Sequence, residues 1–461
     1  MEDLANIAIS AALETGVSFV DVRIENSIST IIEMTDGITK RALSSHLKGA
    51  GIRAFVGGAW AFAQTTDMTP SGMRETGKSV AKLALATKHR VKESFEIHGP
   101  TYTDRVFFKP KKDFRDIPIE DKIHYTKTID DQARVYDERV TNTRTVYGEL
   151  WTNLYVVNSF GTSIYRENSL PRIVSVTTAK EGSNRQRAYR SFGTLGGFEK
   201  IEQERPQNIG TESAKKAIEL LDSKAAKGGT YDVVMDPVLN GVMVHEAFGH
   251  ACEADGFLAH ATVLEDKLDM SVGPDHLNIS DDPTIPEMRG SFEYDWEGTK
   301  TQKRCLVKDG ILTELLHSLE TASRLDMTTN GSARAQSFMD VPIPRMSNTF
   351  MEPGDWERDE IIAETKNGIL LCNFNYGYTE PAKGQFMFQA SHGYMIENGE
   401  LGQMVRDVSL AGQILDILSK IDAVGNDFQL EAGTCGKNGQ SVPDMSGGPH
   451  ARIIEIPVGG M

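Results

Sequence analysis

Residues 230–250 read TYDVVMDPVLNGVMVHEAFGH, and this stretch joins an apolar run, a helix start and a metal-binding motif. Residues 230–236 are typical of a buried strand. Pro237 follows directly and suits the first position of a helix, where its missing N–H costs nothing. The apolar residues that continue to Val244 predict that this helix is largely buried. We therefore expect a strand that leads straight into a core helix.

The end of this stretch carries His245, Glu246 and His250. Catalytic zinc binds neutral imidazoles, and a carboxylate beside them can accept a proton from water. The usual motif spaces its histidines four residues apart, whereas five residues place them about 140° apart on an ideal helix. Two imidazoles that far apart do not meet at one ion. The spacing therefore predicts a local π-bulge, with Gly249 as the weak point. The alternative is a pair of histidines that only pack in the core.

Two histidines leave the site one protein ligand short of the three that a catalytic zinc needs. The chain offers four candidates, which are Cys252, Glu253, His260 and Cys435. The first two follow His250 within three residues, and the third lies past a turn. The last lies in the glycine-rich segment 433–439, which we expect to form a loop. Spacing alone does not choose among them, and either cysteine is also compatible with simple packing.

Outward from this site, the pattern predicts a mixture of helices and short strands. Strands are expected at 18–24, 29–33 and between 143 and 190. Four glycine-containing pairs divide apolar runs and predict hairpin turns: Gly57-Gly58, Asp309-Gly310, Asn367-Gly368 and Asn398-Gly399. Helices are expected near 3–14, 70–89, 118–137, 209–224 and 408–421.

A chain of 461 residues exceeds what one hydrophobic core usually supports, so we expect two domains. Residues 224–229, KAAKGG, are typical of a linker. The predicted fold class is α+β. Residues 1–226 should form an N-terminal mixed α/β sheet domain, and residues 227–461 a strand-rich domain that carries the zinc-binding helix.

Composition restricts the possible partners. The net charge of −16 argues against nucleic acid, because binding to duplexes requires a basic surface. The four cysteines are widely spaced and predict a reducing compartment. The acidic start of the chain is unlike a signal peptide, and no apolar run approaches 18 residues. We therefore expect a cytoplasmic protein that binds neither nucleic acid nor a membrane.

Several motifs in one order give a more specific indication than any single motif. The histidine motif at 245–250 is followed about 185 residues later by TCGKNGQS at 434–441, with further phrases between them. These phrases are PIPRMSNT at 342–349, LCNFN at 371–375, YMIENG at 394–399 and VGND at 424–427. Together they resemble the TldD branch of the TldD/PmbA zinc metallopeptidase family. The N-terminal half resembles this family more loosely.

The resemblance implies a set of roles. It implies that zinc is bound by His245, His250 and Cys435, and that Glu246 is the catalytic base. It also implies a metallopeptidase that cleaves short or unfolded peptides, in a homodimer or in a heterodimer with an inactive paralogue. Because this chain keeps the whole motif, it resembles the catalytic branch.

Three other functions fit part of the sequence. A zinc amidase or deacetylase would use the same metal site on a small molecule. A non-catalytic regulatory dimer partner would leave Glu246 without a purpose, since structural zinc needs four protein ligands and no base. A Cys435 nucleophile would leave both histidines idle. The residue types that could stabilise an oxyanion are His317, Arg334, Arg345, His392 and His450.

Overall fold

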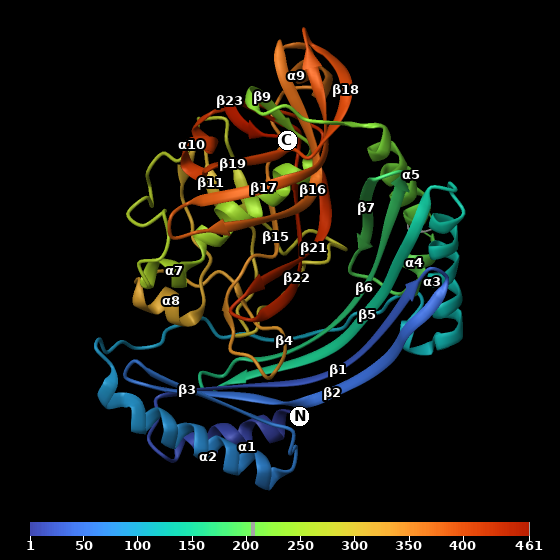
Figure 1. Ribbon diagram of the computed structural model, residues 1–461. Coiled ribbons are helices and arrows are strands. Elements are labelled where there is room, and N and C mark those ends of the chain that lie inside the picture. The colour runs from blue at the N-terminus through green and yellow to red at the C-terminus, as the bar shows by residue number, and fades with distance from the viewer. Residues whose placement is uncertain (204–207, 461) are drawn as a thin grey trace.

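Long antiparallel strands form the N-terminal part of the protein (Figure 1). The computed structural model describes residues 1–203 and 208–460. The sheet of this part has the order β3-β2-β1-β5-β6-β4, and β7 also pairs with β6. Its strands are β1 (Phe19–Thr35), β2 (Ile38–Val56), β3 (Ala59–Thr65), β4 (Thr103–Val106), β5 (Val140–Asn158), β6 (Ser163–Glu181) and β7 (Asn184–Gly193). The strands predicted at 18–24 and 29–33 are therefore one continuous strand.

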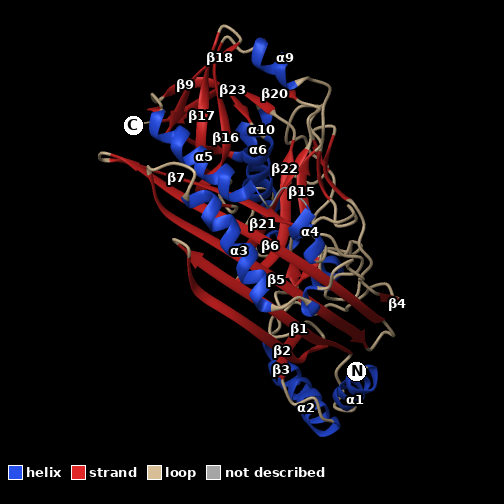
Figure 2. Cartoon of the chain, turned by 90° about the vertical axis from the view of Figure 1, so that its right-hand side faces the viewer, coloured by secondary structure: helices blue, strands red, loops and turns tan. Residues whose placement is uncertain are grey.

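Two groups of helices cover the ends of this sheet. Near the amino terminus lie α1 (Glu2–Leu13), α2 (Pro70–Thr87) and the short 3₁₀ turn η1 (Lys88–Arg90). At the other end lie η2 (Phe114–Asp116), α3 (Ile119–Arg134), α4 (Phe198–Gln203) and α5 (Ile209–Asp222) (Figure 2). The four long helices confirm the predictions at 3–14, 70–89, 118–137 and 209–224. The mixture of helices and strands confirms the predicted α+β class.

The C-terminal part contains two further large sheets. The eight-stranded one has the order β16-β9-β23-β19-β17-β18-β8, with β20 beside β23, and β16 also pairs with β17. It consists of β8 (Lys224–Ala225), β9 (Gly229–Met235), β16 (Asn367–Glu380), β17 (Gln385–Glu397), β18 (Glu400–Arg406), β19 (Ser409–Gln413), β20 (Ile421–Val424) and β23 (Ala451–Gly459). The predicted domain boundary at 226/227 falls between β8 and β9.

The other large sheet brings the late part of the chain beside the middle part. Its order is β12-β11-β10-β15-β22-β21, so β21 lies at an edge. It consists of β10 (Ile279–Asp281), β11 (Arg304–Lys308), β12 (Ile311–Leu312), β15 (Asn348–Met351), β21 (Gln429–Lys437) and β22 (Gln440–Gly448), and a separate pair is formed by β13 (Ala333–Arg334) and β14 (Ile343–Pro344).

The helices of the C-terminal part are short. They are α6 (Pro237–Val242), the π turn η4 (Met243–Phe248), the 3₁₀ turn η5 (Gly249–Cys252), α7 (Ala254–Leu258), α8 (Leu319–Arg324), α9 (Arg358–Ala363) and α10 (Ile414–Ser419). Met243, Val244 and Phe248 belong to the largest buried cluster, together with Leu371 of β16 and Met346. The motif helix is therefore part of the core, as its apolar residues predicted.

One predicted turn and one predicted helix start in this half are wrong. Asn367-Gly368 begins β16 instead of forming a hairpin turn. Gly368 is needed because a Cβ there would lie 2.6 Å from the Asp232 carbonyl oxygen of β9. Residues 409–413 form β19 and not the start of a helix, because they pair with β17, and only 414–419 are helical. The other three predicted turns are confirmed: Gly57-Gly58 joins β2 to β3, Asp309-Gly310 joins β11 to β12, and Asn398-Gly399 joins β17 to β18.

The N-terminal sheet packs directly against the C-terminal part. Gly51 allows this contact, because a Cβ there would lie 2.2 Å from the Phe338 carbonyl oxygen. A buried group of charges lies at the same place, where Arg53 of β2 pairs with Asp21 of β1 and, at 2.7 Å, with Glu297. We call Asp21, Arg53 and Glu297 the Arg53 cluster. It fixes the N-terminal strands to the half of the chain that carries the histidine motif.

Candidate metal centre

The histidine motif lies where a regular helix widens. Asp236 caps the start of α6, since its Oδ1 accepts a hydrogen bond from Leu239 N at 2.8 Å. From Met243 to Phe248 the backbone forms a π turn, which confirms the π-bulge predicted from the spacing of the histidines. Gly249 follows directly, and a Cβ there would lie 2.1 Å from the sulfur of Met346. The wider turn brings both imidazoles to one side of the chain.

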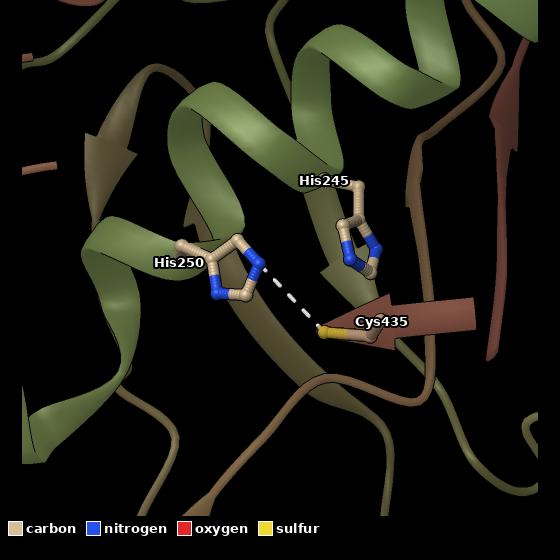
Figure 3. A group of neighbouring side chains, drawn as sticks. All are labelled: His245, His250 and Cys435. Carbon is tan, nitrogen blue, oxygen red and sulfur yellow. Dashed lines mark hydrogen bonds between the residues drawn. The ribbon is translucent and has the colours of Figure 1, made fainter. Parts of the chain in front are cut away.

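Three potential metal donors meet at this turn (Figure 3). One donor atom each of His245, His250 and Cys435 lies within 4.8 Å of the other two. The sulfur of Cys435 is 3.7 Å from His250 Nε2. Both rings point toward the sulfur. A set of two nitrogens and one sulfur suits zinc, which binds imidazole and thiolate together.

Cys435 does not lie in a loop, so that prediction is wrong. It belongs to β21, where it pairs with Val442 of β22, and the turn comes later at residues 438–439. Gly433 serves close packing, because a Cβ there would lie 2.9 Å from the carboxylate of Asp444. Gly436 has free space around it, and Gly439 lies in the turn with a φ of +75°. A strand holds the thiol more rigidly than a loop would.

The electrostatic surroundings favour an ionised thiol at this place. Burial opposes ionisation of Cys435, but His245 and His250 outweigh it and lower its pKa to about 6. Burial likewise opposes protonation of His245, yet Cys435 and Asp444 raise its pKa to about 9. Cys435 is also buried, at 1% exposure. A thiolate and two imidazoles confined in this way match the donor set of a bound divalent cation.

A buried carboxylate lies at the Nδ1 side of each histidine. His250 Nδ1 lies 2.9 Å from Glu253 Oε2, which leaves Nε2 on the side of Cys435. His245 Nδ1 lies 3.4 Å from Asp444 Oδ2, although it makes no hydrogen bond within the described residues. Carboxylates in this position orient metal-binding imidazoles and raise their basicity.

Glu253 is itself held by two cations. Lys437 Nζ lies 3.0 Å from its Oε2, and Arg345 Nε lies 4.0 Å from its Oε1. Burial raises the pKa of Glu253, but His250 and Lys437 outweigh this and lower it to about 2. Arg345 also donates to the Cys435 carbonyl oxygen at 2.6 Å. Asp444, Lys437 and this role of Arg345 were missed from the sequence. Only the position of Glu253, three residues after His250, gave a signal.

The other three candidate ligands do not join the three donors. Cys252 is fully buried in the apolar core, and burial raises its thiol pKa well above the usual value. His260 is exposed and pairs with Glu265. Glu253 is close, but it faces the Nδ1 side of His250. The structure therefore brings together His245, His250 and Cys435.

Glu246 lies beside the donors and borders two cavities. Its Oε2 is 3.7 Å from His250 Nε2, and its side chain is 37% exposed. A cavity of about 500 Å³ on one side is lined by Glu246 and His250, and by residues 436–438. A second cavity, of about 290 Å³, is lined by Glu246 and His245 and by parts of β7 and β21. A ligand could therefore extend in both directions from this carboxylate.

The side chains considered for oxyanion stabilisation lie elsewhere. None of the five is among the described residues that line the two cavities beside Glu246. Arg334 donates to the carbonyl oxygens of Met346 and Pro443. His450 pairs with Asp427. Of the others, Arg345 supports the Cys435 strand, as described above, and His317 and His392 are buried.

One known protein family matches three consecutive parts of this chain. Sequence models of the PmbA/TldA metallopeptidase family match three consecutive parts of the chain: domain 1 at 20–85, the central domain at 112–221 and the C-terminal domain at 228–460. The chain belongs to the PmbA/TldA metallopeptidase family. The C-terminal match, at 228–460, includes all three donors and Glu246.

Relatives in the PmbA/TldA family cover nearly the whole chain. A metalloprotease of Methanothermobacter thermautotrophicus is 36% identical over 97% of this chain and 97% of its own. A metalloprotease TldD homolog of Haemophilus influenzae is 29% identical over 96% and 93%. A zinc metalloprotease TldD homolog of Saccharolobus solfataricus is 28% identical over 98% and 99%.

Solved structures share the fold. TldE from Thermococcus kodakarensis superposes with a TM-score of 0.79 at 16% identity, over all of both chains. A Thermotoga maritima protein gives a TM-score of 0.81 at 22% identity, over 99% of this chain and all of the other. Within residues 1–203 and 208–460, no helix is long and apolar enough to cross a membrane.

Proposed function

We propose that this member of the family is a zinc-dependent peptidase of the HExxxH type that cleaves short or unfolded peptides. One observation carries the proposal. Three donors suited to zinc lie within 4.8 Å of one another, and a half-exposed carboxylate beside them borders cavities on both sides. A purely structural metal would not need such access.

Each residue has a distinct part in this proposal. His245, His250 and Cys435 would hold the ion, while Asp444 and Glu253 orient the two imidazoles. A zinc ion held there would supply Lewis acidity, which makes water a better nucleophile at neutral pH and polarises a carbonyl group. A thiolate donates more charge than a third imidazole, so the protein must contribute well-placed groups of its own.

Glu246 is the residue that moves the proton. Its carboxylate would take a proton from the attacking water as the water oxygen bonds to the carbonyl carbon of the substrate. When the C–N bond breaks, the same carboxyl group would return that proton to the leaving amine. The exposure of its side chain and its position between two cavities allow both transfers.

Two strand edges next to the site support an extended peptide as the substrate. β7 and β21 each pair on one side only within the described part of the chain. The smaller cavity lies between them, since Tyr189 and Ser191 of β7 line it together with residues 431–434 of β21. A peptide that adds to such an edge is bound by its main chain, with little dependence on sequence. We expect the protein to form a dimer, either of two copies of this chain or with an inactive paralogue. Light scattering measures the oligomeric state of the protein.

Glu246→Gln tests the proposal. We expect the variant to keep one zinc per chain and to lose about 10²- to 10⁴-fold in cleavage of a quenched fluorescent peptide mixture and of an unfolded protein. Glu360→Gln, on the exposed face of α9, is the matched control and should cleave like the wild type. Cleavage that survives in Glu246→Gln would refute this mechanism even with zinc present.

A further inference from the structure

A third cavity, more apolar than the larger of the two beside Glu246, lies near the metal centre. It has a volume of about 420 Å³ and is lined by residues from four separate parts of the chain. Its apolar walls are Trp60 and Phe62 of β3, Leu258 and Ala259 around the end of α7, and Val341 and Ile343. We call this cavity the Trp60 pocket. The N-terminal sheet thus contributes directly to a cavity beside the C-terminal metal centre.

The Trp60 pocket adjoins the larger cavity beside Glu246. Asp255 and Ala259 line both cavities. A short series of contacts joins it to the metal centre: His250 Nδ1 to Glu253 at 2.9 Å, Glu253 to Lys437 Nζ at 3.0 Å, and Lys437 to Asp255 at 2.7 Å. These contacts together span less than three residues of an extended peptide, roughly 10 Å. A side chain close to the cleaved bond can therefore reach the pocket.

The lining also contains ionised groups, but each has a partner. Arg53 is paired with Asp21 and Glu297, and its guanidinium lies 4.7 Å from the centre of the Trp60 ring. Arg324 lies 3.6 Å from Glu320. Asp255 is paired with Lys437. Since each of these charges already has a partner, an entering charged side chain would lose water without gaining one.

The aromatic wall is held in place before any ligand enters. The Trp60 ring packs against Phe55 with 4.9 Å between centroids and meets Phe19 edge-on at 5.9 Å. Together with Arg53, these contacts hold the indole in place. Val341, in contrast, is 37% exposed although it is apolar, so the pocket offers uncovered apolar surface. A fixed aromatic wall binds apolar groups at a small entropic cost.

We propose that the Trp60 pocket selects the substrate by accepting a large apolar or aromatic side chain within three residues of the cleaved bond. This inference rests on the proposed peptidase function and adds selectivity to it. Main-chain pairing at the strand edges would hold any extended peptide, whereas this pocket would favour peptides that carry such a side chain. The residues that determine the preference are Trp60, Phe62 and Leu258.

The test compares peptides that differ at one position. A set of otherwise identical unfolded peptides carries Phe, Leu, Ala, Asp or Lys at each of the three positions on either side of one cleaved bond. We expect the Phe peptide to exceed the Ala peptide by about 10- to 100-fold in kcat/KM at one position, with Asp and Lys no better than Ala. Equal kcat/KM for Phe and Ala at all six positions would overturn the inference. If cleavage also persists in Glu246→Gln, the proposed function fails instead.

Two variants separate a pocket from a general effect on the enzyme. Trp60→Ala removes the aromatic wall of the pocket, and Ala259→Phe fills the pocket with a side chain from an exposed position. Both should bring the Phe/Ala ratio close to one, and a ratio does not depend on how much of the variant is folded. Trp356→Ala is the matched control. Trp356 is also half-buried and lies 5.9 Å from an arginine, Arg452, but it does not line the Trp60 pocket. An unchanged ratio in both pocket variants would refute the role of Trp60.

Discussion

Two of the buried clusters of ionisable side chains, the Arg53 cluster and the candidate metal centre, differ in how far their members satisfy one another. In the Arg53 cluster, Asp21 and Glu297 both accept hydrogen bonds from one guanidinium. At the metal centre, His245 Nδ1 and Asp444 Oδ1 have no hydrogen-bond partner among the described residues. Burial of unsatisfied polar atoms costs free energy, so the groups around the metal centre satisfy one another less well than those of the Arg53 cluster.

This difference agrees with a structural role for the Arg53 cluster and with the zinc-binding role proposed for the metal centre. The Arg53 cluster joins two parts of the chain and has no further need of a ligand. The metal centre combines a thiol whose pKa is lowered to about 6 with two imidazoles and supporting carboxylates, and it lies beside two cavities. Burial and charge alone do not distinguish the two clusters. The donor set of two imidazoles and a thiol, together with the adjoining cavities, does.

The largest effect is expected from Cys435→Ser. Wild-type protein should bind one zinc per chain and gain about 4 kcal/mol of stability when free zinc exceeds the dissociation constant about 1,000-fold. Cys435→Ser should lose most of this gain, because serine does not supply a thiolate. Elemental analysis and thermal unfolding with and without zinc measure both quantities.

Cys305→Ser is the control for this comparison. Cys305 lies on β11, half-buried, and its sulfur contacts the Val307 carbonyl oxygen. This variant should keep the zinc-dependent gain in stability. If Cys435→Ser also keeps it in full, the third ligand is not Cys435, and the neighbouring Glu253 becomes the next candidate.

Arg53→Met should cost about 3–5 kcal/mol in the free energy of unfolding, because it leaves Asp21 and Glu297 buried without their cation. Chemical denaturation measures this loss, and zinc binding per folded chain should stay the same. Arg144→Met is the control, since Arg144 and Glu33 form an exposed pair that contributes about 0–1 kcal/mol. A loss below 1 kcal/mol for Arg53→Met would show that water reaches the Arg53 cluster.

The sequence predicted the local features of the metal centre better than its surroundings. The spacing of His245 and His250 predicted the π turn, because backbone geometry within one turn depends on few residues. The position of Cys435 on a strand was not predicted, since its neighbouring glycines also suit a loop. Gly433 lies against Asp444 in the next strand, and a single sequence does not give that contact.

A similar division holds for the fold. Gly57-Gly58 predicted a hairpin correctly, because a turn with positive φ at both positions is a local property. Asn367-Gly368 gave the same signal and was wrong, since Gly368 is required by the close approach of β9. The Arg53 cluster was not predicted at all, because Arg53 and Glu297 are 244 residues apart. Contacts between distant segments decide these cases.

Asp444→Asn tests the support behind a proposed ligand. It should lower zinc affinity by about 10- to 100-fold while one zinc per chain still binds at saturation, because the amide orients His245 without its negative charge. Competition with a chromophoric chelator measures the affinity. Asp422→Asn, whose carboxylate pairs with Arg452, is the control and should bind zinc normally. Complete loss of zinc in Asp444→Asn would instead make Asp444 a ligand.

The smallest effect concerns His317, a buried histidine that lacks the partners of His245. Burial lowers its pKa to about 4, whereas Cys435 and Asp444 raise that of His245 despite burial. Its Nδ1 contacts Thr321 Oγ1 at 3.2 Å, and Nε2 has no partner within the described residues. It is a buried imidazole that stays neutral because no anion compensates a charge.

The pH dependence of stability follows from this shift. Below pH 6.5 the unfolded chain binds a proton at His317 that the folded protein does not bind until about pH 4, so stability falls as the pH decreases through this range. Between pH 7.5 and 6 the loss is about 1 kcal/mol. The difference in unfolding free energy between wild type and His317→Gln isolates it, because every other group titrates alike in both. His46→Gln, at an exposed position, should follow the wild type. An identical pH slope in His317→Gln would mean that the imidazole takes up its proton at the same pH in the folded and unfolded states, which would contradict the expected effect of burial.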